Sequence, residues 1–353
     1  MTDTKMTYRF LGNSGLLVSK FSLGSWMFYD TTEPRYTADN WYKMVKTAFK
    51  HGINLFDNAE NYANGRSEEI MGDAIKRGIQ DGVWTRDDLV VTTKLFVGTK
   101  GFVEGGPNDQ GLGRKHIVEG LKASLRRLQL DNVDVVFCHR SEPYTPIEET
   151  VRAMNFVIEQ GWTYYWGTSE WLASDIQEAC EIADRLGLIR PVAEQPQYSL
   201  FDRNKVDFEF VDLYKKYKLG LTTWSPLSFG VLSGKYSAGK PAESRFTTPF
   251  FRDVPMVPSF EKRVEIADKI KPIAAELGCS LPQLALAWCV SNENVSTVLV
   301  GASRPEQLEE NLKALNFVEK ITPEVKAKID AIVNFVPTVP VANELATLRG
   351  RFL

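Results

Sequence analysis

The sequence predicts an α/β fold, a closed (β/α)8 TIM barrel, from three observations. Short apolar runs alternate with amphipathic segments of helical period along the 353 residues, which is the arrangement that builds a parallel sheet. The alternation repeats eight times, as a closed barrel requires. The GxGxxG motif of a doubly wound nucleotide-binding sheet is missing after the first strand, although that sheet remains the main alternative.

The elements follow from the period of the apolar residues and from end signals. The strands are expected at residues 21–26, 53–57, 89–94, 133–139, 163–169, 192–197, 219–227 and 295–303. Helices are expected at residues 37–51, 67–79, 114–128, 146–160, 173–186, 205–217 and 305–315. At the start of the fourth helix, Pro146 suits the first turn, and Glu148 and Glu149 complement the helix dipole.

Three further segments complete the predicted architecture. Residues 8–21 are expected to form a hairpin around Asn13, Ser14 and Gly15 that closes the bottom of the barrel. Two βα connections, residues 96–113 and 228–259, are long enough to be functional loops at the mouth of the barrel. No low-complexity linker divides the chain, so a single domain over residues 1–353 is expected.

Composition and charge exclude several classes of protein. The chain is 43% hydrophobic and 25% charged, with 42 basic against 45 acidic side chains and a net charge of -3, so no global field favours nucleic acid or a membrane surface. Cys138, Cys180, Cys279 and Cys289 form no CxxC pair, which favours buried free thiols over disulfides or a metal site. Without a signal peptide or an apolar run of about 18 residues, a soluble cytoplasmic protein is expected.

Four titratable side chains follow predicted strands at the carboxyl end, where barrel enzymes carry their chemistry. They are Asp57, Tyr62, Lys94 and His139. Each one alone has a plainer explanation. Tyr62 could be a packing aromatic, Lys94 could extend its ammonium to solvent, His139 could be a satisfied core histidine, and Asp57 could cap a helix.

Together these four side chains have complementary chemistry. An ammonium close to a phenol favours the phenolate, so Lys94 is expected to lower the pKa of Tyr62, while Asp57 holds the ammonium in place. His139 would donate a hydrogen bond to the same oxygen that Tyr62 protonates. This combination predicts general acid catalysis on a carbonyl group.

The chain resembles the aldo-keto reductases, in family order, over nearly all of residues 8–316. The stretches that carry the resemblance are "LGNSGLLVSKFSLGSW", "GINLFDNAENYANGRSEEIMG", "TTKL", "VDVVFCHR", "YYWGTSEW", "EQPQYSLFDR", "WSPLSFGVLSGKY" and "VLVGASRPEQLEENL". In that family a nicotinamide coenzyme lies across the barrel mouth without a Rossmann domain, so the missing GxGxxG is expected. The resemblance implies that Asp57, Tyr62, Lys94 and His139 form the catalytic tetrad.

Within this superfamily the chain is most similar to the branch of voltage-gated potassium channel β-subunits. "ETVRAMNFVIEQGWTYYWGTS" and "LGCSLPQLALAWC" carry that likeness. Vertebrate members of the branch resemble "FANR" where this chain has "FCHR", and His139 therefore restores the more usual reductase histidine. The branch implies a homotetramer and a potassium-channel cytoplasmic domain as a partner.

The resemblance also implies coenzyme and substrate contacts. The coenzyme contacts are Ser25, Trp26, Ser169, Gln195, Trp224, Ser225, Pro226, Leu227, Ser228, Gly230, Lys235, Arg245, Gly301, Ser303, Arg304, Gln307, Glu310 and Asn311. The substrate pocket would comprise Trp26, Tyr62, His139 and Arg140. A Gly-Ala-Ser turn that opens a helix is an anion site, and Arg304 beside it favours NADP(H) over NAD(H). Ser303 could instead be only a helix cap, and Glu310 only a solvated charge.

Three functions remain open at this point. The sequence favours NADPH-dependent reduction of aldehydes or ketones to alcohols, with Tyr62 as the proton donor. The alternative is a channel β-subunit whose bound coenzyme senses redox state. A purely structural barrel, which would not bind NADPH, is the third.

Overall fold

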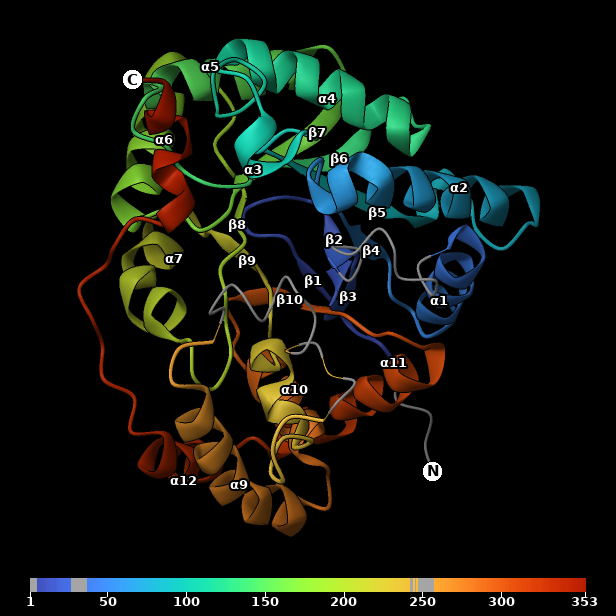
Figure 1. Ribbon diagram of the computed structural model, residues 1–353, viewed down its shortest axis with the longest axis vertical. Coiled ribbons are helices and arrows are strands. Elements are labelled where there is room, and N and C mark those ends of the chain that lie inside the picture. Colours follow the sequence, from blue (N-terminus) through green and yellow to red (C-terminus); the bar gives the residue numbers. More distant parts are fainter. Residues whose placement is uncertain (1–4, 27–36, 242–243, 245, 247–256) are drawn as a thin grey trace.

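The computed structural model describes residues 5–26, 37–241, 244, 246 and 257–353, and a closed barrel of eight parallel strands lies at its centre (Figure 1). The strands are β3 (Phe21–Gly24), β4 (Leu55–Asp57), β5 (Val90–Leu95), β6 (Val133–Cys138), β7 (Thr163–Thr168), β8 (Ala193–Glu194), β9 (Gly220–Thr223) and β10 (Val295–Val300). Strand β10 pairs in parallel with both β9 and β3, which closes the sheet. The predicted TIM barrel is therefore confirmed, and the doubly wound sheet is excluded.

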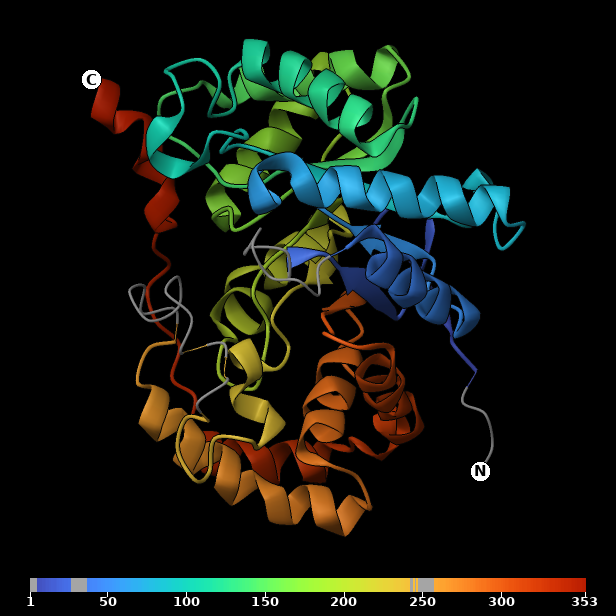
Figure 2. The same cartoon turned by 45° about the vertical axis from the view of Figure 1, so that its right-hand side comes forward.

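The helices that the apolar period predicts surround this barrel (Figures 1 and 2). They are α1 (Ala38–Lys50), α2 (Arg66–Gln80), α4 (Arg114–Leu128), α5 (Ile147–Glu159), α6 (Ala173–Leu186), α7 (Val211–Tyr217) and α11 (Pro305–Leu312). Their boundaries follow local chemistry. The hydroxyl of Thr37 accepts a hydrogen bond from Asn40 N at 3.2 Å and caps α1. Helix α7 is preceded by a π-helical turn, η4 (Lys205–Glu209).

Several helices have no counterpart in the prediction. They are α3 (Gly101–Glu104), α9 (Phe260–Leu277), α10 (Leu281–Val290), α12 (Pro323–Val333) and the 3-10 segments η2 (Tyr62–Gly65), η3 (Arg86–Asp88), η5 (Ser228–Ser233) and η8 (Glu344–Phe352). The helix expected at residues 305–315 is divided between α11 and the 3-10 segment η7 (Lys313–Lys320). Helix α10 buries residues on all sides, so it has no polar stripe to reveal its period. Within the described ranges, no single helix is both long and apolar enough to cross a bilayer, and α9 with α10 meets those criteria only as a pair bent by 82°.

Several predicted strands end earlier than expected, and for β8 and β9 the local chemistry explains the early end. The ladder of β8 stops at Glu194 because Pro196, two residues on, has no N–H to donate. The strand expected at residues 219–227 ends at Thr223, and Ser225 then adopts a φ of 54°, which no strand residue takes. The segments that follow β8 and β9 both turn at the mouth of the barrel.

The N-terminal hairpin closes the lower end of the barrel, as predicted. Strands β1 (Tyr8–Phe10) and β2 (Leu17–Ser19) pair antiparallel. Leu11 and Val18 are fully buried there against the inward side chains of the barrel strands, including Leu55 and Phe137. A Cβ at Gly12 would lie 2.1 Å from Val192 O, so only glycine fits this close approach.

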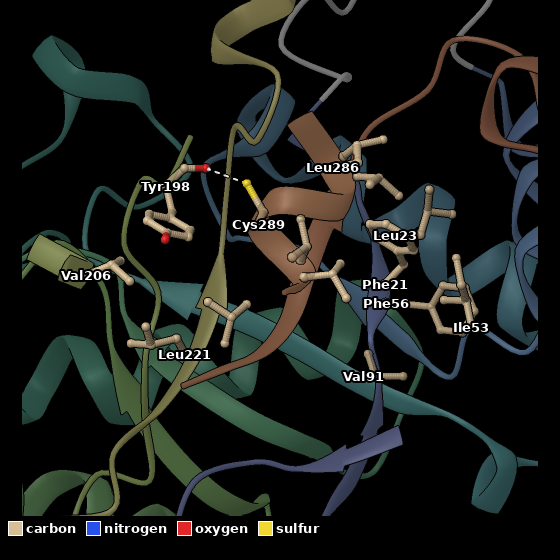
Figure 3. Packing of buried hydrophobic residues seen from close by; sticks show 14 of the residues in the cluster. Phe21, Leu23, Ile53, Phe56, Val91, Tyr198, Val206, Leu221, Leu286 and Cys289 are labelled. Carbon is tan, nitrogen blue, oxygen red and sulfur yellow. Dashed lines mark hydrogen bonds between the residues drawn. The ribbon is translucent and has the colours of Figure 1, made fainter. Parts of the chain in front are cut away.

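The main apolar core fills the space between the barrel and its outer helices. Figure 3 shows Phe21, Leu23 and Phe56 of the barrel in one cluster with Leu286 and Cys289 of α10. Burying each large apolar side chain contributes about 1.5–3 kcal/mol. All four cysteines are free, and three of them are buried, in agreement with the sequence.

The C-terminal segment runs along the outside of the molecule from α12 to the upper rim (Figures 1 and 2). It is anchored there through η8, where Arg349 Nη1 donates to Glu142 Oε1 at 2.9 Å. Glu142 lies in the connection between β6 and α5. The chain terminus is thereby attached to a loop on the same side of the barrel as the carboxyl ends of the strands.

Candidate active site

Because the eight strands run parallel, the polar residues at their carboxyl ends meet at one mouth. Tyr62 reaches this mouth through the tight turn η2. Ala63, Asn64 and Gly65 all have positive φ, at 49°, 55° and 92°, so the chain reverses within three residues and enters α2. The phenol of Tyr62 is thereby folded back over the strand end and buried.

Lys94 occupies the centre of a buried polar cluster. Its Nζ donates to Asp57 Oδ2 at 2.5 Å, to Asn58 O at 2.7 Å and to Tyr62 Oη at 3.2 Å, which uses all three ammonium donors. The side chain has 0% exposure, so Lys94 does not extend its charge to solvent. The carboxylate of Asp57 is also held on its other oxygen, where Thr92 Oγ1 donates at 2.7 Å.

His139 lies beside the phenol, directly after β6. The rings of Tyr62 and His139 meet edge to face with their centroids 5.7 Å apart. The Nδ1 atom of His139 is buried and has no hydrogen-bond partner in the described part of the chain, so His139 is not a satisfied core histidine. A buried polar atom without a partner is a place where a ligand can bind.

Burial and charge together set the protonation states of the cluster. Burial, with the charges of Arg140 and Lys94, holds the pKa of His139 well below its ordinary value, so the ring is neutral at pH 7. Burial opposes the charge on Lys94, but Asp57 and Tyr62 outweigh it and raise the pKa of the ammonium. The cluster at neutral pH therefore contains a charged lysine and a neutral imidazole.

The pKa of Tyr62 differs from the prediction. Lys94 does act to lower it, but burial of the phenol acts more strongly in the other direction, and the pKa is raised above its ordinary value. The prediction considered the neighbouring ammonium and not the loss of water around the hydroxyl. Tyr62 is therefore a protonated donor at neutral pH in the unliganded protein.

Ser169 and Gln195, which follow β7 and β8, lie next to this cluster. Ser169 Oγ donates to Gln195 O at 2.9 Å. Gln195 Nε2 contacts Asp57 Oδ1 and Thr222 Oγ1, both at 3.2 Å. The structure thus brings polar groups from β5, β8 and β9 together around Asp57 at the end of β4.

Trp26 and Trp224 lie on either side of an aromatic residue that was not predicted. Phe229 contacts Trp26 and Trp224 edge to face, each at 5.9 Å between ring centroids. The indole N–H of Trp224 donates to Glu170 Oε1 at 3.0 Å, which fixes the plane of the ring. Phe229 lies within the stretch "WSPLSFGVLSGKY". Its position in that motif was the signal in the sequence that could have identified it as a site residue.

The turn that follows β9 is built from unusual backbone angles. Ser225, Ser228, Phe229 and Gly230 all have positive φ, in a turn that also includes Pro226 and Leu227. Ser228 Oγ accepts from Arg263 Nη1 at 2.9 Å. Lys235 is exposed at the end of this turn, and Arg245 lies outside the described residues.

Arg263 is a second residue that sequence reasoning missed. It comes from α9 and pairs with both oxygens of Asp202, at 2.8 and 2.9 Å. No motif signals it, because the helix that carries it has no clear apolar period and the pairing joins residues 61 positions apart. Arg263 ties the turn after β9 to the outer helix.

The turn before α11 gathers the remaining predicted residues. Ser303 N and Oγ both donate to Gln307 Oε1 at 3.0 Å. The N-cap residue is Arg304, which is exposed and makes no side-chain cap, so Ser303 is not the helix cap. Glu310 accepts from Gln283 Nε2 at 2.9 Å and is therefore more than a solvated charge.

Gly301 and Asn311 lie at the two ends of this segment. Gly301 follows β10 and is exposed. The Nδ2 atom of Asn311 is buried and makes no hydrogen bond to any described residue. Ser25 and Arg140 complete the predicted set near the tetrad, where Ser25 N donates to Asp57 O at 3.0 Å and Arg140 Nη1 lies 3.4 Å from Ser169 Oγ.

A parallel barrel with these polar groups at its mouth is typical of a class of enzymes. Comparison with known proteins identifies the family within that class. The sequence profile of the Aldo/keto reductase family matches residues 20–334, and the chain belongs to that family. Members of the family are oxidoreductases that generally bind NAD(P)H.

Curated relatives give a finer comparison. The chain is 51% identical over 337 residues to a protein of Oryza sativa subsp. japonica named probable voltage-gated potassium channel subunit beta, covering 94% of this chain and 98% of that one. A probable subunit of the same name from Arabidopsis thaliana is 49% identical, covering 95% and 99%. A putative one from Schizosaccharomyces pombe is 46% identical, covering 94% of each.

Proposed function

We propose that this protein reduces aldehydes or ketones to alcohols with NADPH. The observation that supports this most directly is the contact of Lys94 Nζ with both Asp57 Oδ2 and Tyr62 Oη, beside a neutral His139. A phenol backed by an ammonium can lose its proton to a substrate oxygen, because the phenolate that forms is stabilised by the charge next to it.

The residues around the mouth fit a nicotinamide coenzyme. His139 Nδ1 and Asn311 Nδ2 are buried polar atoms without partners among the described residues, and α11 begins without a side-chain cap, so its first N–H groups suit a phosphate. Arg304 at this helix start favours a 2'-phosphate and hence NADPH. Ser169 and Gln195 would hold the carboxamide, and Trp224 would stack on the nicotinamide ring.

The coenzyme, when bound, supplies a hydride to the carbonyl carbon. Tyr62 Oη and a ring nitrogen of His139 hold the carbonyl oxygen and polarise the C=O bond. As negative charge develops on that oxygen, Tyr62 donates its proton, and an alcohol forms. Lys94 stabilises the phenolate, and Asp57 keeps the ammonium charged and oriented, while Trp26 and Arg140 border the substrate.

Replacing Tyr62 by phenylalanine tests this proposal. Tyr62→Phe removes the proton donor and leaves the ring, so kcat for 4-nitrobenzaldehyde should fall by about 100- to 10,000-fold. The affinity for NADPH, measured by tryptophan fluorescence, should stay within about twofold of the wild type. A variant that keeps its kcat would refute the role of Tyr62, and a wild type that binds no NADPH would favour a structural barrel.

A second function is favoured by the names of three relatives that match over at least 94% of this chain. We propose that the protein also forms a homotetramer that binds the cytoplasmic domain of a voltage-gated potassium channel. Size-exclusion chromatography with light scattering measures the tetramer, and co-elution with a tetrameric channel domain measures the binding. A monomer that does not co-elute with that domain would contradict this proposal and leave the reductase proposal standing.

A further inference from the structure

A second buried ion pair joins the loop that follows β4 to α4, and the proposed mechanism does not use it. Glu60 Oε1 and His116 Nε2 are 2.9 Å apart, and their side chains are only 2% and 7% exposed. Glu60 precedes Tyr62 by two residues, whereas His116 is in the first turn of α4. The pair therefore joins the segment that carries the phenol to an outer helix.

The carboxylate of Glu60 also holds the chain that follows Lys94. The same oxygen, Oε1, accepts hydrogen bonds from Phe96 N at 2.7 Å and Gly98 N at 2.9 Å. In addition, Glu60 N donates to Lys94 O at 3.1 Å. One side chain thus connects the loop of the proton donor to the strand end of its ammonium partner.

The electrostatics of the pair agree with this geometry. Burial opposes both charges, but the charge of His116 and the hydrogen bonds from three donors lower the pKa of Glu60. Burial likewise opposes protonation of His116, yet Glu60, Asp109 and Glu142 raise its pKa. Asp109 lies on the β5–α4 connection and Glu142 on the β6–α5 connection, so two further carboxylates favour the charged imidazole.

The packing leaves the pair little freedom to rearrange. A Cβ added to Gly120, one turn along α4, would lie 3.2 Å from Glu60 Oε2 and 3.3 Å from His116 Cε1. A buried ion pair contributes little net stability compared with apolar packing, and its value is in defining one arrangement. The arrangement defined here is that of the two loops that follow β4 and β5, relative to each other and to α4.

We propose that Glu60 and His116 are positioning residues that set the Tyr62 hydroxyl against Lys94 and His139. This inference rests on the proposed reductase function, because it assigns the pair to the geometry of proton donation. Displacement of a reacting group by about 1 Å can lower a rate by about 100-fold. The pair should therefore affect kcat and leave coenzyme binding unchanged.

The test compares Glu60→Gln with one matched control variant in carbonyl reduction. Glu60→Gln keeps an acceptor for Phe96 N and Gly98 N but removes the charge that faces His116, and kcat should fall by about 10- to 100-fold with the NADPH affinity unchanged. Glu68→Gln is the matched control, since Glu68 is also fully buried and pairs with Arg127 Nε at 2.7 Å, in an ion pair that joins α2 to α4. Glu68→Gln should lower the thermal midpoint and leave kcat within about twofold.

The protonation of His116 gives a readout that does not depend on activity. The chain has only 3 histidines, so imidazole NMR on protein labelled with 15N-histidine resolves each ring, and His116→Gln assigns the signal. In the wild type, the His116 ring should stay protonated at pH values above the ordinary histidine pKa. In Glu60→Gln, the ring should lose its proton at a lower pH than in the wild type. An ordinary titration of His116 in the wild type would overturn the inference.

The outcomes separate this inference from the function on which it rests. If Tyr62→Phe abolishes reduction and Glu60→Gln leaves kcat unchanged, the positioning role is wrong and the reductase function stands. If Tyr62→Phe has no effect, both fall. If Glu60→Gln and Glu68→Gln lower kcat equally, the effect comes from general destabilisation and the positioning role is wrong.

Discussion

Glu194 carries the sharpest prediction about pH. The residue ends β8, has 0% exposure, and accepts a hydrogen bond from Thr168 Oγ1 at 2.5 Å. Burial raises the pKa of Glu194 from 4.5 to about 8, although Lys205 and Thr168 act to lower it. The folded protein should therefore hold a neutral carboxylic acid at pH 7, next to the proposed coenzyme residue Gln195.

The magnitude follows from linkage. Between pH 4.5 and pH 8 the folded state keeps a proton that the unfolded chain releases, so the free energy of unfolding falls as pH rises through this range. Integration from pH 6 to pH 8 gives a loss of about 2 kcal/mol from this one group. Glu194→Gln cannot ionise and lacks this loss, so its stability relative to the wild type should rise by about 2 kcal/mol over the same interval.

Urea unfolding followed by tryptophan fluorescence, at pH 6 and pH 8, measures the difference between wild type and Glu194→Gln. Infrared difference spectra of the protonated-carboxyl band then show the same group directly, because Glu194→Gln removes the band. Other groups also titrate in this range, but their contributions cancel between the two proteins. Parallel stability curves for the two proteins would mean that Glu194 is ionised throughout, and the reasoning would be refuted.

Two substitutions test the packing that positions the mouth. Leu11→Ala opens a cavity beneath the barrel and should lower the free energy of unfolding by about 2–5 kcal/mol, and a loss below about 1 kcal/mol in urea unfolding would mean that the hairpin is not a plug. Gly78→Ala places a methyl group 1.9 Å from the ring of Trp84, so a loss of about 1–3 kcal/mol is expected. Gly15→Ala is the control, because a methyl group there meets no atom within 4 Å. Equal thermal midpoints for Gly78→Ala and Gly15→Ala would contradict the clash with Trp84.

Much of the fold could be predicted because its signals are local. Apolar residues on one face identified α1 and α4, and short apolar runs identified the eight barrel strands. Parallel strands place their carboxyl ends together, so the meeting of Asp57, Tyr62, Lys94 and His139 followed from the order of the elements. Helix α10 escaped detection because a helix buried on all sides has no polar face.

The remaining features depend on contacts between distant residues. The sequence by itself determined the barrel, the mouth and the residue types that meet there, since period and order along the chain are enough for these. Only the tertiary structure decided that Lys94 is buried, that burial outweighs its charge at Tyr62, and that Glu60 meets His116 across 56 positions. The physical reason is that pKa values and ion pairs depend on water exclusion and on distance in space, and neither is written in the spacing of residues along a chain.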